Sequence, residues 1–176
     1  TNWDVSNVTN MASMFGFSTN FNGRISSWDV SNVTDMASMF ANTTNFNQNL
    51  ANWDVSNVTD MAYMFFYTSI FNQNISSWDI SNVTQIQYMF KDAASFNQDI
   101  SNWDISNINN MTGIFDNTSL STNNKCAIHT TFSASPYWEY DWSGNCDDDN
   151  DGIINSDEIA GCQDTTACNY NSSATD

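Results

Sequence analysis

The chain has few basic residues, one proline and no long apolar run. Three of its 176 residues are Lys or Arg, against 20 Asp and Glu, so the formal net charge is -17. Nucleic acids and anionic membrane surfaces are bound through Lys and Arg side chains, so this balance argues against both as partners. No segment approaches the ~20 consecutive apolar residues of a membrane-spanning helix, so membrane insertion is not expected.

Cysteine is absent from the first 120 residues, and catalytic groupings are absent from the whole chain. The four cysteines fall between Cys126 and Cys168. Even-numbered, clustered Cys predict disulfides and an oxidising, extracellular or cell-surface compartment. The lone His129 has no Cys or Ser partner at the spacing of a nucleophilic site, so it is expected to be a packed or surface residue. The sequence therefore predicts a protein that is not an enzyme.

What the sequence does contain is a repeat of 25 residues. Its copies begin at Trp3, Trp28, Trp53, Trp78 and Trp103. A period held this evenly predicts a repeat architecture in which each copy contacts only its neighbours. Apolar residues recur at fixed positions, which in the second repeat are Val30, Val33, Met36, Met39, Phe40, Phe46 and Leu50. Because the chain opens inside a repeat, we expect it to be a piece of a longer protein.

Spacing within a repeat predicts one strand and one short helix. Residues 28–31 alternate apolar and polar side chains, as a half-buried strand does. Met36, Met39 and Phe40 are spaced as one face of a helix, with Thr34 as its cap. We therefore expect an α/β solenoid: a right-handed, leucine-rich-repeat-like coil with a parallel strand and a short helix per repeat. The Met and Phe columns are its predicted core rather than a ligand groove.

The unit W-D-V-S-N-V-T-x-M-x-x-M-F resembles the BspA-like leucine-rich repeats of bacterial and protist surface proteins. The resemblance covers residues 1–120. It implies a leucine-rich-repeat-like fold, a secreted or surface-anchored protein, and a role in adhesion or in host and matrix binding. The fifth repeat departs from the pattern, because Asn109 replaces Thr and Ser121 stands where Phe is expected. We therefore expect the repeats to end there.

One column of the repeat is a row of aspartates, which we call the Asp row. It consists of Asp4, Asp29, Asp54, Asp79 and Asp104. If Trp and Val point inward, these carboxylates point outward, and neighbours ~4.8 Å apart repel by roughly 0.9 kcal/mol even in a water-like dielectric. The carboxylates could accept hydrogen bonds from Ser hydroxyls and turn amides, spread into solvent with diffuse counterions, or hold ordered cations or a cationic ligand. The last arrangement would make the row a ligand face.

Asparagines form two further columns, one beginning at Asn7 and the other at Asn22. Their members are Asn7, Asn32, Asn57, Asn82 and Asn107, and Asn22, Asn47, Asn72 and Asn97. Tight turns leave backbone groups that need partners, so we expect these side chains to bond to the neighbouring repeat. The first four members of the first column also lie in glycosylation sequons. We expect that column to be too buried for modification.

Residues 121–146 break the repeat pattern and are predicted to cap the coil. An open end exposes apolar columns, so the last repeat needs a cover. Trp138 and Trp142 are the expected lid of this cap. A disulfide between Cys126 and Cys146 would hold the segment in place.

Residues 147–161 contain a calcium-binding sequence. Asp147 to Glu158 matches the twelve-residue loop D-x-[DN]-x-[DN]-G-x5-E. The ligands of a structural Ca²⁺ would be Asp147, Asp149, Asp151, the carbonyl of Ile153, and Glu158. The alternative is an acidic linker that holds no ion. Because nothing before the loop reads as a helix, it resembles the calcium loops of thrombospondin type-3 or dockerin-like repeats of secreted proteins.

Residues 162–176 are similar to short Cys-rich repeats found in tandem on large secreted proteins. That resemblance implies a further Cys beyond residue 176, which would leave Cys162 or Cys168 without its natural partner. A Cys162–Cys168 bridge is the alternative.

These features together predict a secreted or cell-surface structural or adhesion module, stabilised by calcium. Its expected partner is a protein or glycan at a cell surface or in the matrix, bound through the face of the coil, or another module of the same chain. One alternative is a subunit of an extracellular filament that self-assembles through the ends of the coil. The other is an accessory domain of a glycan-degrading enzyme.

Overall fold

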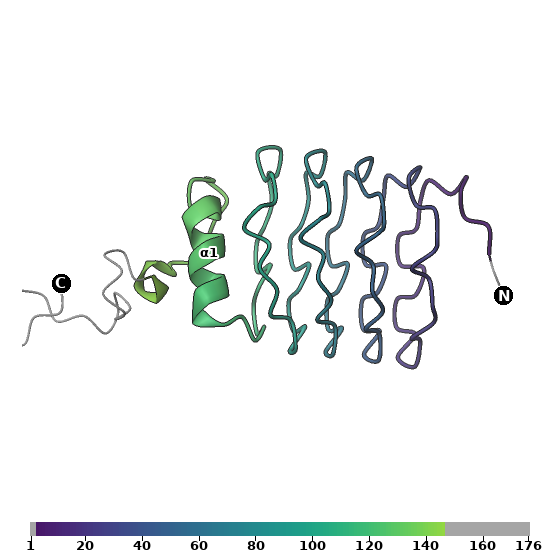
Figure 1. Cartoon of the computed structure of the whole chain (residues 1–176), viewed down its shortest axis with the longest axis horizontal. Helices are drawn as coiled ribbons and strands as arrows, with labels where there is room; N and C mark the ends of the chain where they lie inside the picture. The colour runs from purple at the N-terminus through teal and green to yellow at the C-terminus, as the bar shows by residue number, and fades with distance from the viewer. Residues whose placement is uncertain (1–2, 147–176) are drawn as a thin grey trace, which may run out of the picture.

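A computed structural model describes residues 3–146 of the chain. In this range each repeat makes one winding, and successive windings lie side by side along the long axis (Figure 1). The described helices are α1 (Thr122–Phe132), at the C-terminal end of the stack, and the 3-10 helix η1 (Ser143–Asn145). The β-type pairing in this range consists of isolated parallel bridges, which link Asn10, Asp35, Asp60, Gln85 and Asn110 in order.

The predicted α/β solenoid with a parallel strand and a short helix in each repeat is therefore wrong. No repeat within residues 3–146 contains a strand or a helix. The windings are built from turns instead. Both secondary-structure predictions failed for reasons that can be read from the hydrogen bonds.

Left-handed backbone conformations prevent the predicted helix. Ser38 and Asn42 both have a φ of 57°, and a residue in this region cannot continue a right-handed helix. The amides here also point along the stack: Met36 N–H donates to Asp60 C=O at 2.9 Å, and Ser38 N–H donates to Ala62 C=O at 2.8 Å. The equivalent left-handed positions are Ser13, Ser38, Tyr63, Tyr88 and Gly113, and Phe17, Asn42, Tyr67, Asp92 and Asn117.

Aspartate side chains interrupt the predicted strand. Asp29 Oδ1 accepts a hydrogen bond from the Ser31 amide at 3.1 Å and another from the Ser31 hydroxyl at 2.6 Å. This local turn uses an amide that a strand would need for pairing. Another turn follows at once, because Val33 N–H donates to Val30 C=O at 2.9 Å.

Side chains add hydrogen bonds between windings. Trp53 Nε1 donates to Ile25 C=O at 3.1 Å, and the fully buried Thr43 hydroxyl donates to Phe15 C=O at 2.7 Å. Both predicted Asn ladders are present: Asn32 Nδ2, for example, donates to Ser6 C=O at 2.8 Å. The expectation that the first Asn column is buried was wrong. These residues are exposed, because they bond to carbonyls at the outer edge of the turns.

The apolar columns fill the inside of the windings and form one continuous core. Phe40, Phe65 and Phe90 are fully buried, with ring centroids of successive repeats 5.6 and 5.7 Å apart. A second ring column runs beside the first, with Phe65 stacked on Phe71 at 3.9 Å. A single winding cannot enclose such rings, so each repeat depends on its neighbours for burial.

Helix α1 takes the place of a sixth winding. Ser121 caps it by accepting a hydrogen bond from the Asn124 amide at 3.3 Å. Asn124 Nδ2 donates to Asn97 Oδ1 at 2.8 Å, which continues the Asn ladder into the helix. Ile128 and Phe132 are fully buried against the core. None of the described helices is long and apolar enough to cross a membrane.

An aromatic cluster after α1 packs on the last core ring. The ring centroids of Trp138, Tyr140 and Trp142 lie 6.3, 6.2 and 5.6 Å from that of Phe115. Burial, followed by a hydrogen bond to Asp116, raises the pKa of Tyr140 well above its ordinary value. A disulfide between Cys126 and Cys146 joins α1 to the end of this segment. The aromatic rings and the disulfide together hold a cover over the fifth winding.

Candidate functional site

The Asp row lies exposed along the stack. Each carboxylate accepts a hydrogen bond from the amide of the Ser two residues later, at 2.9 to 3.1 Å. In the first three repeats the Ser hydroxyl also donates, at 2.6 to 2.7 Å. The first of the three arrangements considered for the row is therefore the one observed.

These hydrogen bonds stabilise the charged form of the carboxylates. The Ser hydroxyl, followed by the Ser amide, lowers the pKa of Asp4 and Asp29. For Asp104 the amide of Ser106 is the larger cause of a lowered pKa. Among residues 3–146 no group of three His, Cys, Asp or Glu residues could hold a metal ion. A cationic ligand on the row stays a prediction.

The predicted calcium site lies outside the described residues. This applies to Asp147, Asp149, Asp151, Ile153 and Glu158, and equally to Cys162 and Cys168. The described chain ends at Cys146, which is buried and tied to α1 by the disulfide.

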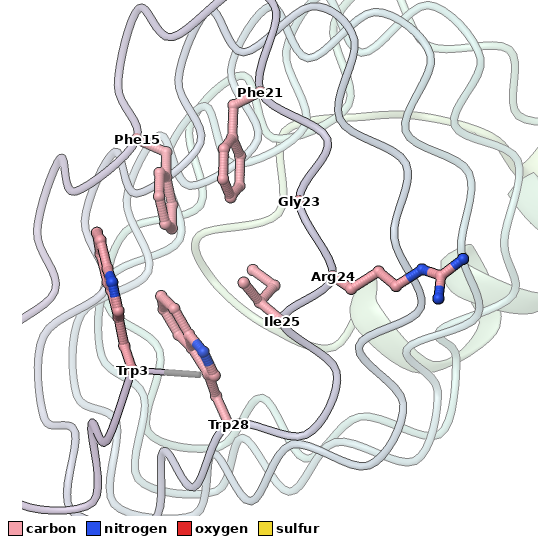
Figure 2. Close-up of a pocket in the computed structure, with 7 residues that line it drawn as sticks. All are labelled: Trp3, Phe15, Phe21, Gly23, Arg24, Ile25 and Trp28. Atoms are coloured by element: carbon pink, nitrogen blue, oxygen red, sulfur yellow. The ribbon is translucent and has the colours of Figure 1, made fainter. Parts of the chain in front are cut away.

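The first winding leaves core rings uncovered by other described residues. A hollow of about 320 Å³ lies there, with Trp3, Phe15, Phe21 and Trp28 around it (Figure 2). Trp3 is 54% exposed, whereas the equivalent Trp53 is 3% exposed. In Figure 2 the Arg24 side chain extends away from these rings.

A second hollow lies between the fifth winding and the segment that follows α1. Its volume is about 500 Å³, and Asp104, Ser106 and Pro136 are among its lining residues. Asp104, the last member of the Asp row, therefore lies beside the segment that follows α1. Asp4 and Asp29 also line a hollow, which is smaller, at about 250 Å³.

The sequence analysis did not predict a fourth hollow, which we call the turn-edge groove. It has a volume of about 280 Å³, and its lining residues are Ser13, Gly16, Phe17, Ser38, Ala41, Asn42, Tyr63 and Phe66. Small residues of the second repeat lie between Phe17 of the first repeat and two aromatic residues of the third. The available signal was the departure from the repeat: the third repeat carries Tyr63 and Phe66 where the second has Ser38 and Ala41.

Large aromatic side chains are exposed at this groove and beside it. Phe17, which lines the groove, is 78% exposed, and Tyr67 is 46% exposed. Ile70, in the same repeat as Tyr67, is 42% exposed. The Tyr67 ring lies edge-on to that of Phe66, with centroids 4.7 Å apart, and Phe66 meets Tyr63 in the same way at 5.6 Å. The third repeat therefore presents a connected aromatic surface next to the small residues of the second.

Comparison with known proteins concerns the repeat region. The family described as "Mycoplasma protein of unknown function, DUF285" matches residues 1–75 and 50–131. No curated protein and no solved structure matches the chain. The matched range includes all five windings and nearly all of α1, which is more than half of the chain. On the basis of this match, the chain belongs to the DUF285 family of repeat proteins.

Proposed function

We propose that this chain is a secreted or cell-surface adhesion module, in which the stacked windings hold a binding surface for a partner. The observation that carries the proposal is the exposure of Phe17 and Tyr67 at the turn-edge groove, together with that of Ile70 in the third repeat. Exposed aromatic side chains held on a rigid support are typical of protein and ligand contact sites. None of these three side chains belongs to the hydrophobic core.

Two further features support an extracellular setting. The repeats resemble the BspA-like repeats of surface proteins, and the chain belongs to a family of repeat proteins. The cap contains a disulfide, and such bonds persist mainly in oxidising compartments. We therefore place the module outside the cell or on its surface.

Adhesion can be measured with beads that carry the full chain. We expect the beads to be retained under flow on mucin, fibronectin or collagen more strongly than albumin-coated beads. The double variant Phe17→Asn/Tyr67→Asn should lower this retention by about tenfold, because aromatic contacts dominate interface energies. Asn already occupies the equivalent positions 42 and 117, so the variant should keep its fold.

The control removes an exposed aromatic residue from another part of the surface. Tyr137, which is 48% exposed on the cap, is changed to Ser and should leave retention unchanged. The proposal is wrong if the chain-coated beads behave like albumin-coated beads on every surface. It is also wrong if the double variant is retained as well as the native chain.

We propose in addition that a structural Ca²⁺ binds residues 147–158, directly after the buried Cys146. Calorimetric titration of the metal-stripped chain should give a single ion per chain. The substitution Asp147→Asn should abolish or strongly weaken this binding, because the first position of the loop motif requires a carboxylate. The matched control Asp54→Asn, in the Asp row, should leave it unchanged. An absence of calcium binding would contradict the proposal. If Asp54→Asn weakened calcium binding, the ion would be assigned to the Asp row instead of residues 147–158.

A further inference from the structure

We infer that the turn-edge groove binds a neutral oligosaccharide, with a sugar ring stacked on the aromatic side chains that line it. This inference rests on the proposed adhesive function and names the chemistry of its ligand. The groove is lined by Phe17 on the side of the first repeat, by Ser38 and Asn42 at its base, and by Tyr63 and Phe66 on the side of the third repeat.

The stack itself sets the width of the groove. Core rings of successive repeats are 5.7 Å apart from Phe15 to Phe40 and 5.6 Å apart from Phe40 to Phe65. Equivalent side chains of the first and third repeats are therefore two such spacings apart, and the second repeat contributes only small residues between them. A sugar ring in van der Waals contact with an aromatic ring needs about 3.5–4.0 Å. The groove therefore has room for one sugar ring stacked on an aromatic side chain.

Polar groups at the groove have no partner within residues 3–146. The hydroxyls of Ser13 and Ser38 and the side-chain amide of Asn42 make no hydrogen bond there. Elsewhere the stack uses such groups: at the position equivalent to Asn42, Asn117 Nδ2 donates to Asp92 Oδ1 at 2.7 Å. Free hydroxyls and an amide beside aromatic rings match a sugar, which has apolar C–H faces and hydroxyl edges.

Charge narrows the class of ligand further. None of the residues that line the groove is charged, so a cationic peptide would find no carboxylate there. The chain carries a net charge of -17, which disfavours acidic glycans and other anions. A volume of about 280 Å³ is close to the lower end of small-molecule sites, which begin at about 300 Å³. A neutral sugar fits each of these limits.

The aromatic residues at and beside the groove hold an unusual backbone conformation. Phe17, Tyr63 and Tyr67 have φ values of 62, 59 and 54°, in the left-handed region that bulky side chains rarely occupy. The fourth repeat has Tyr88 at the position of Tyr63, with a φ of 55°, and the remaining repeats place Ser, Asn, Asp or Gly at these positions. Replacing the aromatic residues with the small residue of another repeat should therefore leave the melting temperature unchanged or raise it.

The experiment measures binding to soluble oligosaccharides by calorimetry and saturation-transfer NMR. The probes are neutral β-glucan, mannan and N-acetylglucosamine oligomers, with oligolysine as the peptide probe. We expect at least one neutral oligomer to bind at a single site per chain. Tyr63→Ser, which removes one wall, and Ser38→Tyr, which fills the base, should each weaken this binding at least tenfold.

Both substitutions copy residues found at equivalent positions, since Ser occupies position 13 and Tyr occupies position 88. The control Tyr137→Ser should leave the affinity unchanged. The inference is overturned if none of the neutral oligomers binds, if only oligolysine binds, or if binding survives both groove variants. Adhesion of coated beads without oligosaccharide binding would overturn this inference and leave the proposed adhesive function in place.

Discussion

Replacing Phe65 by Ala is expected to lower the free energy of unfolding by about 3–5 kcal/mol. Phe65 is fully buried at the centre of the stack. Its ring centroid lies 5.6 Å from that of Phe40, 5.7 Å from that of Phe90 and 3.9 Å from that of Phe71. The neighbouring windings are held by backbone hydrogen bonds and cannot close fully on the cavity. Repacking therefore recovers little of the contact energy that the Phe65 ring provides. Urea unfolding followed by Trp fluorescence measures the change.

Phe17→Ala is the matched control, because it removes the same side chain from the first repeat. Phe17 is 78% exposed and should change stability by no more than about 0.5 kcal/mol. The interpretation of the Phe column as a shared core would be contradicted if Phe65→Ala cost less than about 1 kcal/mol. It would be contradicted equally if the two substitutions had the same effect.

Removing the disulfide of the cap is expected to cost about 3 kcal/mol. Cys126 and Cys146 are 20 residues apart in the sequence. By closing a loop of that length, the bond lowers the conformational entropy of the unfolded chain. The double substitution Cys126→Ser/Cys146→Ser opens this loop. It also frees the end of the segment that holds Trp138 and Trp142 over Phe115. We therefore expect a lower free energy of unfolding and a weaker near-ultraviolet dichroism signal from these indoles.

Chemical reduction provides the control for this double variant. A reducing agent should bring the native chain to the stability of the variant and leave the variant unchanged. If reduction lowers the stability of the variant as well, the effect comes from cysteines other than Cys126 and Cys146. If the variant is as stable as the oxidised native chain, the disulfide does not hold the cap.

The sequence predicted the parts of this protein that depend on periodic burial. A period of 25 residues identifies which side chains are equivalent, and apolar residues that recur at equivalent positions must share one core. The end of the repeats at residue 120 and the need for a cover followed from the same reasoning. The pairing of Cys126 with Cys146 was only one possible arrangement of the four cysteines, and the structure shows it.

The backbone path between the core residues could not be predicted in this way. The spacing of Met36, Met39 and Phe40 suits one face of a helix, but it suits a series of turns equally well. The choice depends on where the amides find partners, and Met36 and Ser38 donate to the next winding. Likewise, Asp29 and Ser31 alternate with apolar residues as a strand would, yet their mutual hydrogen bonds form a turn.

The turn-edge groove was also beyond the reach of the sequence analysis. Its lining residues belong to three repeats, so they meet only when the windings are stacked. By itself the sequence determined which apolar columns form the core, because the burial of apolar side chains follows from their chemistry repeated at a constant period. The tertiary structure alone decided how the chain turns between them and which surface residues face one another, because both depend on hydrogen bonds and contacts between neighbouring windings.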